Sequence, residues 1–172
     1  VRTASGAWAQ LSERESQVIE LMQRQLTTGE IAARLEVSPL ARDFLARGDT
    51  RVTAYDLKFD GPDGAALREK ARAAGVTPAA NHAEAAAGAD IVISAVTASS
   101  ALAVAEQAAT YLKPGQMFFD INSASPGTKT KAAKLVTACG ARYVEGAVMA
   151  PVPGPDLKVP ILSGGPAAEE AT

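Results

Sequence analysis

The sequence predicts a doubly wound, parallel α/β sheet that lacks its first strand and carries a helical appendage at its N-terminus. Three observations support this fold class. From residue 40 onward, short apolar and β-branched runs alternate with Ala-rich helical segments. The run IVISAV at residues 91–96 is apolar without alternation, as in strands that are buried on both faces. Residues 11–39 instead carry apolar side chains at helical spacing, and no strand pattern is seen there.

The composition limits the classes of function that the chain can serve. A chain of 172 residues with 47% hydrophobic residues can form one domain, or one domain plus a small appendage. The net charge of −2 gives no bulk attraction to nucleic acid or to a membrane surface. No apolar run approaches the roughly 18 residues of a membrane span, and the first ten residues lack the apolar core of a signal peptide. With Cys139 as the single cysteine, no internal disulfide is expected, so we predict a cytoplasmic protein.

Residues 11–39 have the pattern of two short helices joined by a turn. Ser12 stands three residues before Glu15, which is the spacing of a capping box at a helix start. The first predicted helix continues to Met22, and Thr28 can cap a second helix over residues 29–37. This stretch resembles the LuxR-type DNA-binding domain from LSERE at residues 11–15, through LTTGEIA at residues 26–32, to Val37 and Ser38. The resemblance implies a partial helix-turn-helix in a domain at residues 1–39.

Two interpretations of this segment are open. A recognition helix needs basic and polar side chains, yet the next residues read PLARDFLARG. Residues 11–48 hold five Arg against six Asp and Glu, so they lack the basic stripe of a DNA-binding surface. We therefore expect two amphipathic helices that pack on a neighbouring domain, with no DNA partner. The alternative is a LuxR-type regulator fragment fused to an α/β module.

The second domain, residues 40–172, contains the alternating elements. After a helix at 40–48, the expected strands are 50–56, 91–96, 117–122, 141–149 and 159–165, and the other helices are 64–75, 82–90, 99–112 and 127–140. Pro114-Gly115 ends the helix whose inner face carries Leu102, Ala105, Ala109 and Leu112. Ser125 and Pro126 supply the N-cap and the first turn of the last helix.

These residues resemble the NAD(P)-binding domain of the β-hydroxyacid dehydrogenase superfamily, which includes 6-phosphogluconate and 3-hydroxyisobutyrate dehydrogenases. The resemblance depends on four segments in order: VTAYD, ADIVISAVTASSA, FFDINSASPGTK, and YVEGAVMAPVP followed by KVPILSGGP. It implies a Rossmann-like fold, a nicotinamide dinucleotide and a small-molecule substrate as partners, and hydride transfer with a 3-hydroxy acid.

The resemblance also assigns site residues. Asp56 would hold the adenosine ribose and favour NAD, since an acid repels a 2′-phosphate, whereas Lys58 leaves room for NADP. The loop after IVISAV would run alongside the cofactor, so Val96 and Thr97 are candidate cofactor contacts. The family's substrate motif D-x-S-T-x-x-P is present as DINSASP, so the substrate-binding residues would be Asn122, Ser123 and Ser125. Asn122 stands where the family has Ser, and Met149 lies in a later motif that departs further.

Each of these residues also has a purely structural interpretation. Asp56 can be an ordinary loop acid, Ser125 a helix cap, and Asn122 and Ser123 turn-forming residues. His82, the only histidine, is expected at the surface or near a helix cap rather than as a general base. Cys139 is expected as a small buried filler. No residue pattern indicates a metal site.

Two parts of such an enzyme are not evident in the sequence. No G-x-G-x-x-G turn precedes residue 40, although those glycines let the backbone approach the pyrophosphate. The helical C-terminal domain, which in this family supplies the catalytic Lys and the dimer contact, is also not seen, so the catalytic residues are unassigned and a homodimer is left open. We therefore expect a truncated oxidoreductase domain without chemistry of its own. A recombined reading frame with no settled function is a third hypothesis.

Overall fold

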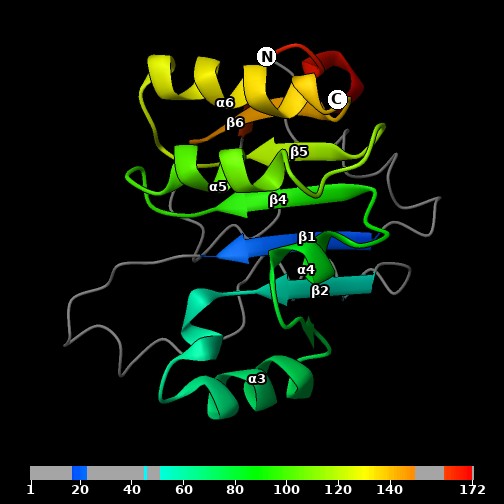
Figure 1. The fold of residues 1–172 in the computed structure, drawn as a ribbon, viewed down its shortest axis with the longest axis vertical. Helices are drawn as coiled ribbons and strands as arrows, with labels where there is room; N and C mark the ends of the chain where they lie inside the picture. Colours follow the sequence, from blue (N-terminus) through cyan, green and yellow to red (C-terminus); the bar gives the residue numbers. More distant parts are fainter. Residues whose placement is uncertain (1–16, 23–44, 46–50, 150–160, 172) are drawn as a thin grey trace.

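The described residues of the computed structural model form one mixed sheet with helices on both faces (Figure 1). The structure describes residues 17–22, 45, 51–149 and 161–171. Its strands are β1 (Gln17–Met22), β2 (Arg51–Tyr55), β3 (Thr77–Pro78), β4 (Ile91–Ala95), β5 (Met117–Asp120), β6 (Arg142–Val148) and β7 (Ile161–Gly164). Its helices are α3 (Gly64–Ala73), α4 (His82–Ala86), α5 (Ala101–Ala108) and α6 (Pro126–Ala138), with 3-10 helices η2 (Leu57–Asp60) and η4 (Ala168–Ala171).

Within these residues the strand order is β3-β2-β1-β4-β5-β6-β7, and every neighbouring pair from β3 to β6 is parallel. The Rossmann-like α/β class predicted from the sequence is therefore confirmed. The pair β6–β7 is antiparallel, which the sequence prediction did not anticipate. A parallel return needs a crossover, usually a helix, and the 12 residues between these strands include four prolines that disfavour one.

Strand β1 corrects the prediction that the sheet lacks its first strand. Residues 17–22, predicted as part of a helix, run parallel between β2 and β4, and Ile19 pairs with Thr53 on one side and Val92 on the other. Strand formation here supplies ladder partners to two edges that would otherwise hold unpaired amides, each costing about 1–3 kcal/mol when buried. That tertiary demand overrides the helical periodicity of a segment that also contains β-branched Val18 and Ile19. The remaining predicted helices before residue 45 lie outside the described residues.

Two hydrophobic clusters cover opposite faces of the sheet, as the alternation along β4 shows. Val92 belongs to the cluster that packs under α4, α5 and α6, whereas Ile91 and Ile93 belong to the cluster that packs with Ala71 of α3 and with helical Leu45. The buried residues of α5 and its C-terminal turn are Ala101, Val104, Ala105, Ala108 and Leu112, so the predicted inner face was partly correct. No helix in the described ranges is long and apolar enough to cross a membrane.

Candidate functional site

The parallel strands bring the predicted site residues to one edge of the sheet. Asp56 follows β2, Val96 follows β4, and Asn122 follows β5 after one intervening residue. Because parallel strands end at the same edge, these residues share the side on which doubly wound sheets bind ligands. The site can therefore be described as two joined loops, after β4 and β5, and a separate acidic position after β2.

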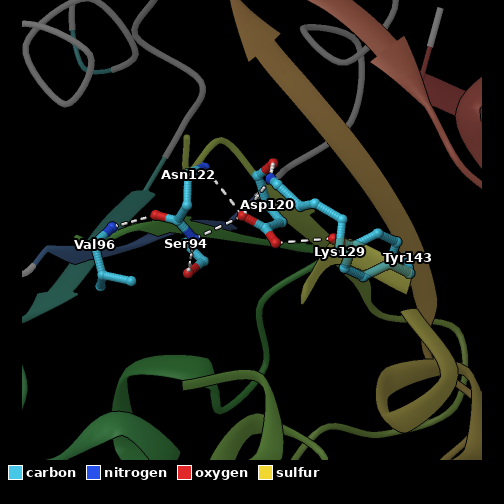
Figure 2. A network of polar contacts seen from close by, with 6 residues as sticks. All are labelled: Ser94, Val96, Asp120, Asn122, Lys129 and Tyr143. Atoms are coloured by element: carbon cyan, nitrogen blue, oxygen red, sulfur yellow. Dashed lines mark hydrogen bonds and ion pairs between the residues drawn. The ribbon is translucent and has the colours of Figure 1, made fainter. Parts of the chain in front are cut away.

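Asn122 joins the two loops (Figure 2). Its carboxamide nitrogen donates to Ser94 Oγ at 3.0 Å and to Asp120 Oδ1 at 2.6 Å. Its carbonyl oxygen accepts a hydrogen bond from the backbone N–H of Val96. With 5% of its surface exposed, the side chain bonds to protein groups rather than to solvent. The structure therefore makes Asn122 a bridge between the ends of β4 and β5.

Behind Asn122 lies a buried ion pair between Asp120 and Lys129, which are 1% and 4% exposed. Lys129 Nζ contacts Asp120 Oδ1 at 2.8 Å and the backbone oxygen of Asp120 at 2.9 Å. Tyr143 donates its hydroxyl proton to Asp120 Oδ2 at 2.8 Å, and the Asn122 backbone N–H donates to Oδ1 at 3.0 Å. Burial, together with the nearby negative charge of Asp120, raises the pKa of Tyr143, so this residue acts as a neutral donor.

The sequence did not indicate three members of this network, Ser94, Lys129 and Tyr143. A signal was present for Lys129, because it shares the buried side of α6 with Ala132 and Val136, three and seven residues later. A lysine on an otherwise apolar helical stripe requires a buried partner.

The predicted hydroxyl residues lie at the exposed side of the same two loops. Ser125 caps α6, as one interpretation of the sequence held: its Oγ accepts from the Thr128 N–H at 3.3 Å. Ser123 is exposed, one residue beyond buried Asn122. Thr97 Oγ1 lies 3.0 Å from the hydroxyls of both Ser99 and Ser100, just before α5. The edge thus presents several hydroxyls beside the buried network.

Asp56 occupies the position expected at the end of β2, where it also caps η2. Its Oδ1 accepts from the Lys58 backbone N–H at 2.9 Å, and among the described residues no group donates to Oδ2. Burial raises the pKa of Asp56 above its ordinary value, partly offset by the Lys58 N–H. Within the described part of the chain, Asp56 thus keeps one carboxylate oxygen without a protein donor.

The residues next to Asp56 contact one another through their side chains. His82 begins α4 and packs edge-on against Tyr55, with ring centroids 4.5 Å apart, and burial lowers its pKa. The Tyr55 hydroxyl donates to Asp60, which also pairs with Arg68 at 3.2 Å. The expectation that His82 lies near a helix cap agrees with this placement. Within the described residues, no group of His, Cys, Asp and Glu could hold a metal ion.

A largely parallel sheet with this strand order is the architecture of doubly wound α/β domains, which bind ligands at the carboxyl edge. Residues 38–168 match the family described as the NAD binding domain of 6-phosphogluconate dehydrogenase, and the chain belongs to that family. A comparison with curated protein sequences finds no match.

Solved structures with this fold agree with the assignment. A conserved hypothetical protein from Sinorhizobium meliloti 1021 is 34% identical, with a TM-score of 0.78 over 92% of this chain and 50% of its own. The conserved protein MTH1747, whose structure is described as similar to 3-hydroxyacid dehydrogenases, is 28% identical, with a TM-score of 0.66 over 89% of this chain and 52% of its own. A Mycobacterium tuberculosis 3-hydroxyisobutyrate dehydrogenase bound to L-serine shares the fold, at 19% identity and a TM-score of 0.69 over 91% of this chain and 48% of its own.

This chain therefore spans about half the length of the solved structures that it matches. None of these similarities supports the LuxR-type helix-turn-helix predicted for residues 11–39, and the family match begins at residue 38.

Proposed function

We propose that this chain is the cofactor-binding domain of an oxidoreductase of the 3-hydroxyacid dehydrogenase type, with NAD preferred over NADP. The main support for the proposal is the connection between the carboxyl ends of β4 and β5. There Asn122 accepts a hydrogen bond from the Val96 backbone, in a domain that belongs to the NAD-binding family. Bound nicotinamide would supply or accept the hydride. The residues described here would bind and orient the dinucleotide.

The residues at the ribose end of the site fit a dinucleotide. Asp56 has a carboxylate oxygen that can accept from ribose hydroxyls, and its charge would repel the 2′-phosphate of NADP. Val96 and Thr97, on the loop that follows β4, would lie along the bound cofactor. The hydroxyls of Thr97 and Ser99 on this loop are uncharged and are compatible with that path.

The pyrophosphate end departs from the usual pattern. Residues 23–28, directly after β1, read QRQLTT and contain no glycine, so the close backbone approach of a G-x-G-x-x-G turn is not encoded there. We therefore expect weaker binding of the dinucleotide than in a domain with that turn.

The substrate part of the proposal is a 3-hydroxy acid held beside Ser123 and Ser125. Both side chains are exposed at the edge next to the buried network, and hydroxyls suit the oxygen atoms of such an acid. The described network offers no exposed base near them, because Lys129 is buried in its pair with Asp120. We accordingly expect dinucleotide binding but no substrate turnover by this chain alone.

Calorimetric titration with NAD tests the proposal. We expect binding in the millimolar range or tighter, weakened about tenfold, or 1.4 kcal/mol, in Asp56→Ala. Asp63→Ala is the matched control, because Asp63 is an exposed acid near η2 whose side chain caps nothing. Absence of heat at millimolar NAD, or equal weakening by both substitutions, would contradict the proposed site.

A further inference from the structure

We propose that Asn122 is a positioning residue, which locks the backbone after β4 to the loop after β5 in an orientation enforced by the Asp120–Lys129 pair. On this view the side chain does not contact substrate, and exposed Ser123 faces the ligand in its place. The effect on ligand binding rests on the function proposed above. The lock itself is a property of the folded chain.

The carboxamide donors of Asn122 are fully used inside the protein. Its two N–H groups donate to Ser94 and Asp120, and its oxygen accepts from the Val96 N–H. A carboxamide has only two donors, so none is left for a ligand. Because the residue is buried, a ligand that took over one of these N–H donors would break its present bond and leave a buried polar group unpaired.

The charge of Asp120 determines which way the carboxamide points. Turning it by half a rotation would place its oxygen against Asp120 Oδ1, which now accepts at 2.6 Å, and its N–H groups against the Val96 N–H. Both new contacts would be repulsive. Lys129 contacts the same carboxylate oxygen at 2.8 Å, so the ion pair and the orientation of Asn122 form one unit.

This unit fixes the spacing of two neighbouring loops. Val96 leaves β4 and Asn122 leaves β5, and the two strands are paired in parallel up to Ser94 and Asp120. Beyond that point, the Asn122–Val96 bond and the backbone bond from the Ile121 N–H to the Ser94 oxygen, 3.1 Å long, continue the connection. The lock thereby holds the cofactor-facing loop beside the substrate-facing loop.

Asn122→Asp tests whether Asn122 positions the Val96 backbone or only stabilises the fold, because only the first role predicts a pH-dependent Val96 signal. The new carboxyl would be in direct contact with Asp120 of β5. Asp120 in turn pairs with Lys129 of α6, accepts from Tyr143 of β6 and lies in register with Glu145 of β6, so these are the charged and titratable groups around it. Two adjacent carboxyls raise one another's pKa, so the new group should titrate above the ordinary value of about 4. Below its midpoint, the protonated carboxyl can donate to Asp120 and accept from Val96. Above it, repulsion opposes the lock.

The measurement is the NMR signal of the Val96 amide as a function of pH, together with NAD titrations at the same pH values. We expect the Val96 signal to titrate in Asn122→Asp but not in the native chain, and NAD affinity in the variant to fall as pH rises through that midpoint. Asn81→Asp is the matched control. Asn81 is exposed and caps α4, outside the hydrogen bonds of Asn122, so this substitution should leave the Val96 signal unchanged.

A second variant keeps the proposal decidable if ionised Asn122→Asp unfolds. In Asn122→Ala, amide exchange at Val96 should accelerate about tenfold or more while Ile93, inside β4, keeps its protection. Unchanged Val96 exchange would overturn the lock. A titrating Val96 with NAD affinity independent of pH would overturn its role in ligand positioning. A native chain that binds no NAD would instead overturn the proposed function, and the Val96 signals would still decide the lock.

Discussion

Replacing Lys129 with methionine should destabilise the fold by about 3 kcal/mol. Removing one partner from a buried ion pair typically costs about 3–5 kcal/mol, because the remaining charge stays buried without compensation. We expect the lower end of this energy range, because Asp120 keeps three hydrogen-bond donors: the Asn122 backbone N–H, the Asn122 carboxamide and the Tyr143 hydroxyl. Methionine retains most of the apolar stem of the lysine, so the loss of packing is small.

Urea unfolding followed by far-ultraviolet circular dichroism measures this change. Lys131→Met is the matched control on the same helix, because Lys131 is exposed, and it should stay within about 0.5 kcal/mol of the native chain. Adding Asp120→Asn to Lys129→Met should recover part of the loss, since no unpaired charge then remains. Equal stability of the Lys129 and Lys131 variants would refute the reasoning, and so would strictly additive losses in the double variant.

Three further predictions follow from single side chains. Asp56→Asn should raise NADP affinity relative to NAD about tenfold by calorimetry, and an unchanged ratio would contradict ribose binding there. Because burial lowers the pKa of His82, its contribution to stability is present above the unfolded value of 6.5 and lost as pH falls through the folded value. Thermal unfolding of His82→Gln should therefore depend less on pH between neutral and mildly acidic conditions than that of the native chain, and parallel curves would contradict this. Gly146→Ala would place a Cβ 2.7 Å from the Phe119 ring and should cost about 1–3 kcal/mol in urea unfolding, whereas a neutral effect would show that the ring can move.

Most of the fold from residue 51 onward was predictable because most of its strands and helices carry strong local patterns. The apolar run IVISAV became β4, the strand pattern MFFDIN became β5, and Ser125-Pro126 marked the start of α6. In these segments the local preference and the tertiary environment agree, which is the condition under which sequence patterns succeed.

Strand β1 was not predictable from its own residues. QVIELM has apolar side chains at spacings compatible with a helix, and nothing local reveals that β2 and β4 each need a ladder partner. That requirement exists only once the sheet is assembled. The direction of β7 depended likewise on the connection before it and not on its own sequence.

The candidate site was predictable in position but not in the division of roles. The sequence brought Asn122, Ser123 and Ser125 together as one motif, yet the structure buries the first and exposes the other two. The Asn122 side chain bonds to Ser94 of β4 and to Asp120 of β5, and Lys129 on the apolar side of α6 pairs with the same Asp120. Long-range partners of this kind decide which side chain of a motif can reach a ligand.

The most direct test of the central proposal is a titration of the isotope-labelled chain with NAD, followed through its backbone amide signals. Dinucleotide binding at the carboxyl edge predicts saturable shifts at Asp56, Val96, Thr97 and Ser123, with small changes at exposed Lys131 and Lys134 on α6. Shifts confined to other parts of the chain, or none at millimolar NAD, would contradict the account.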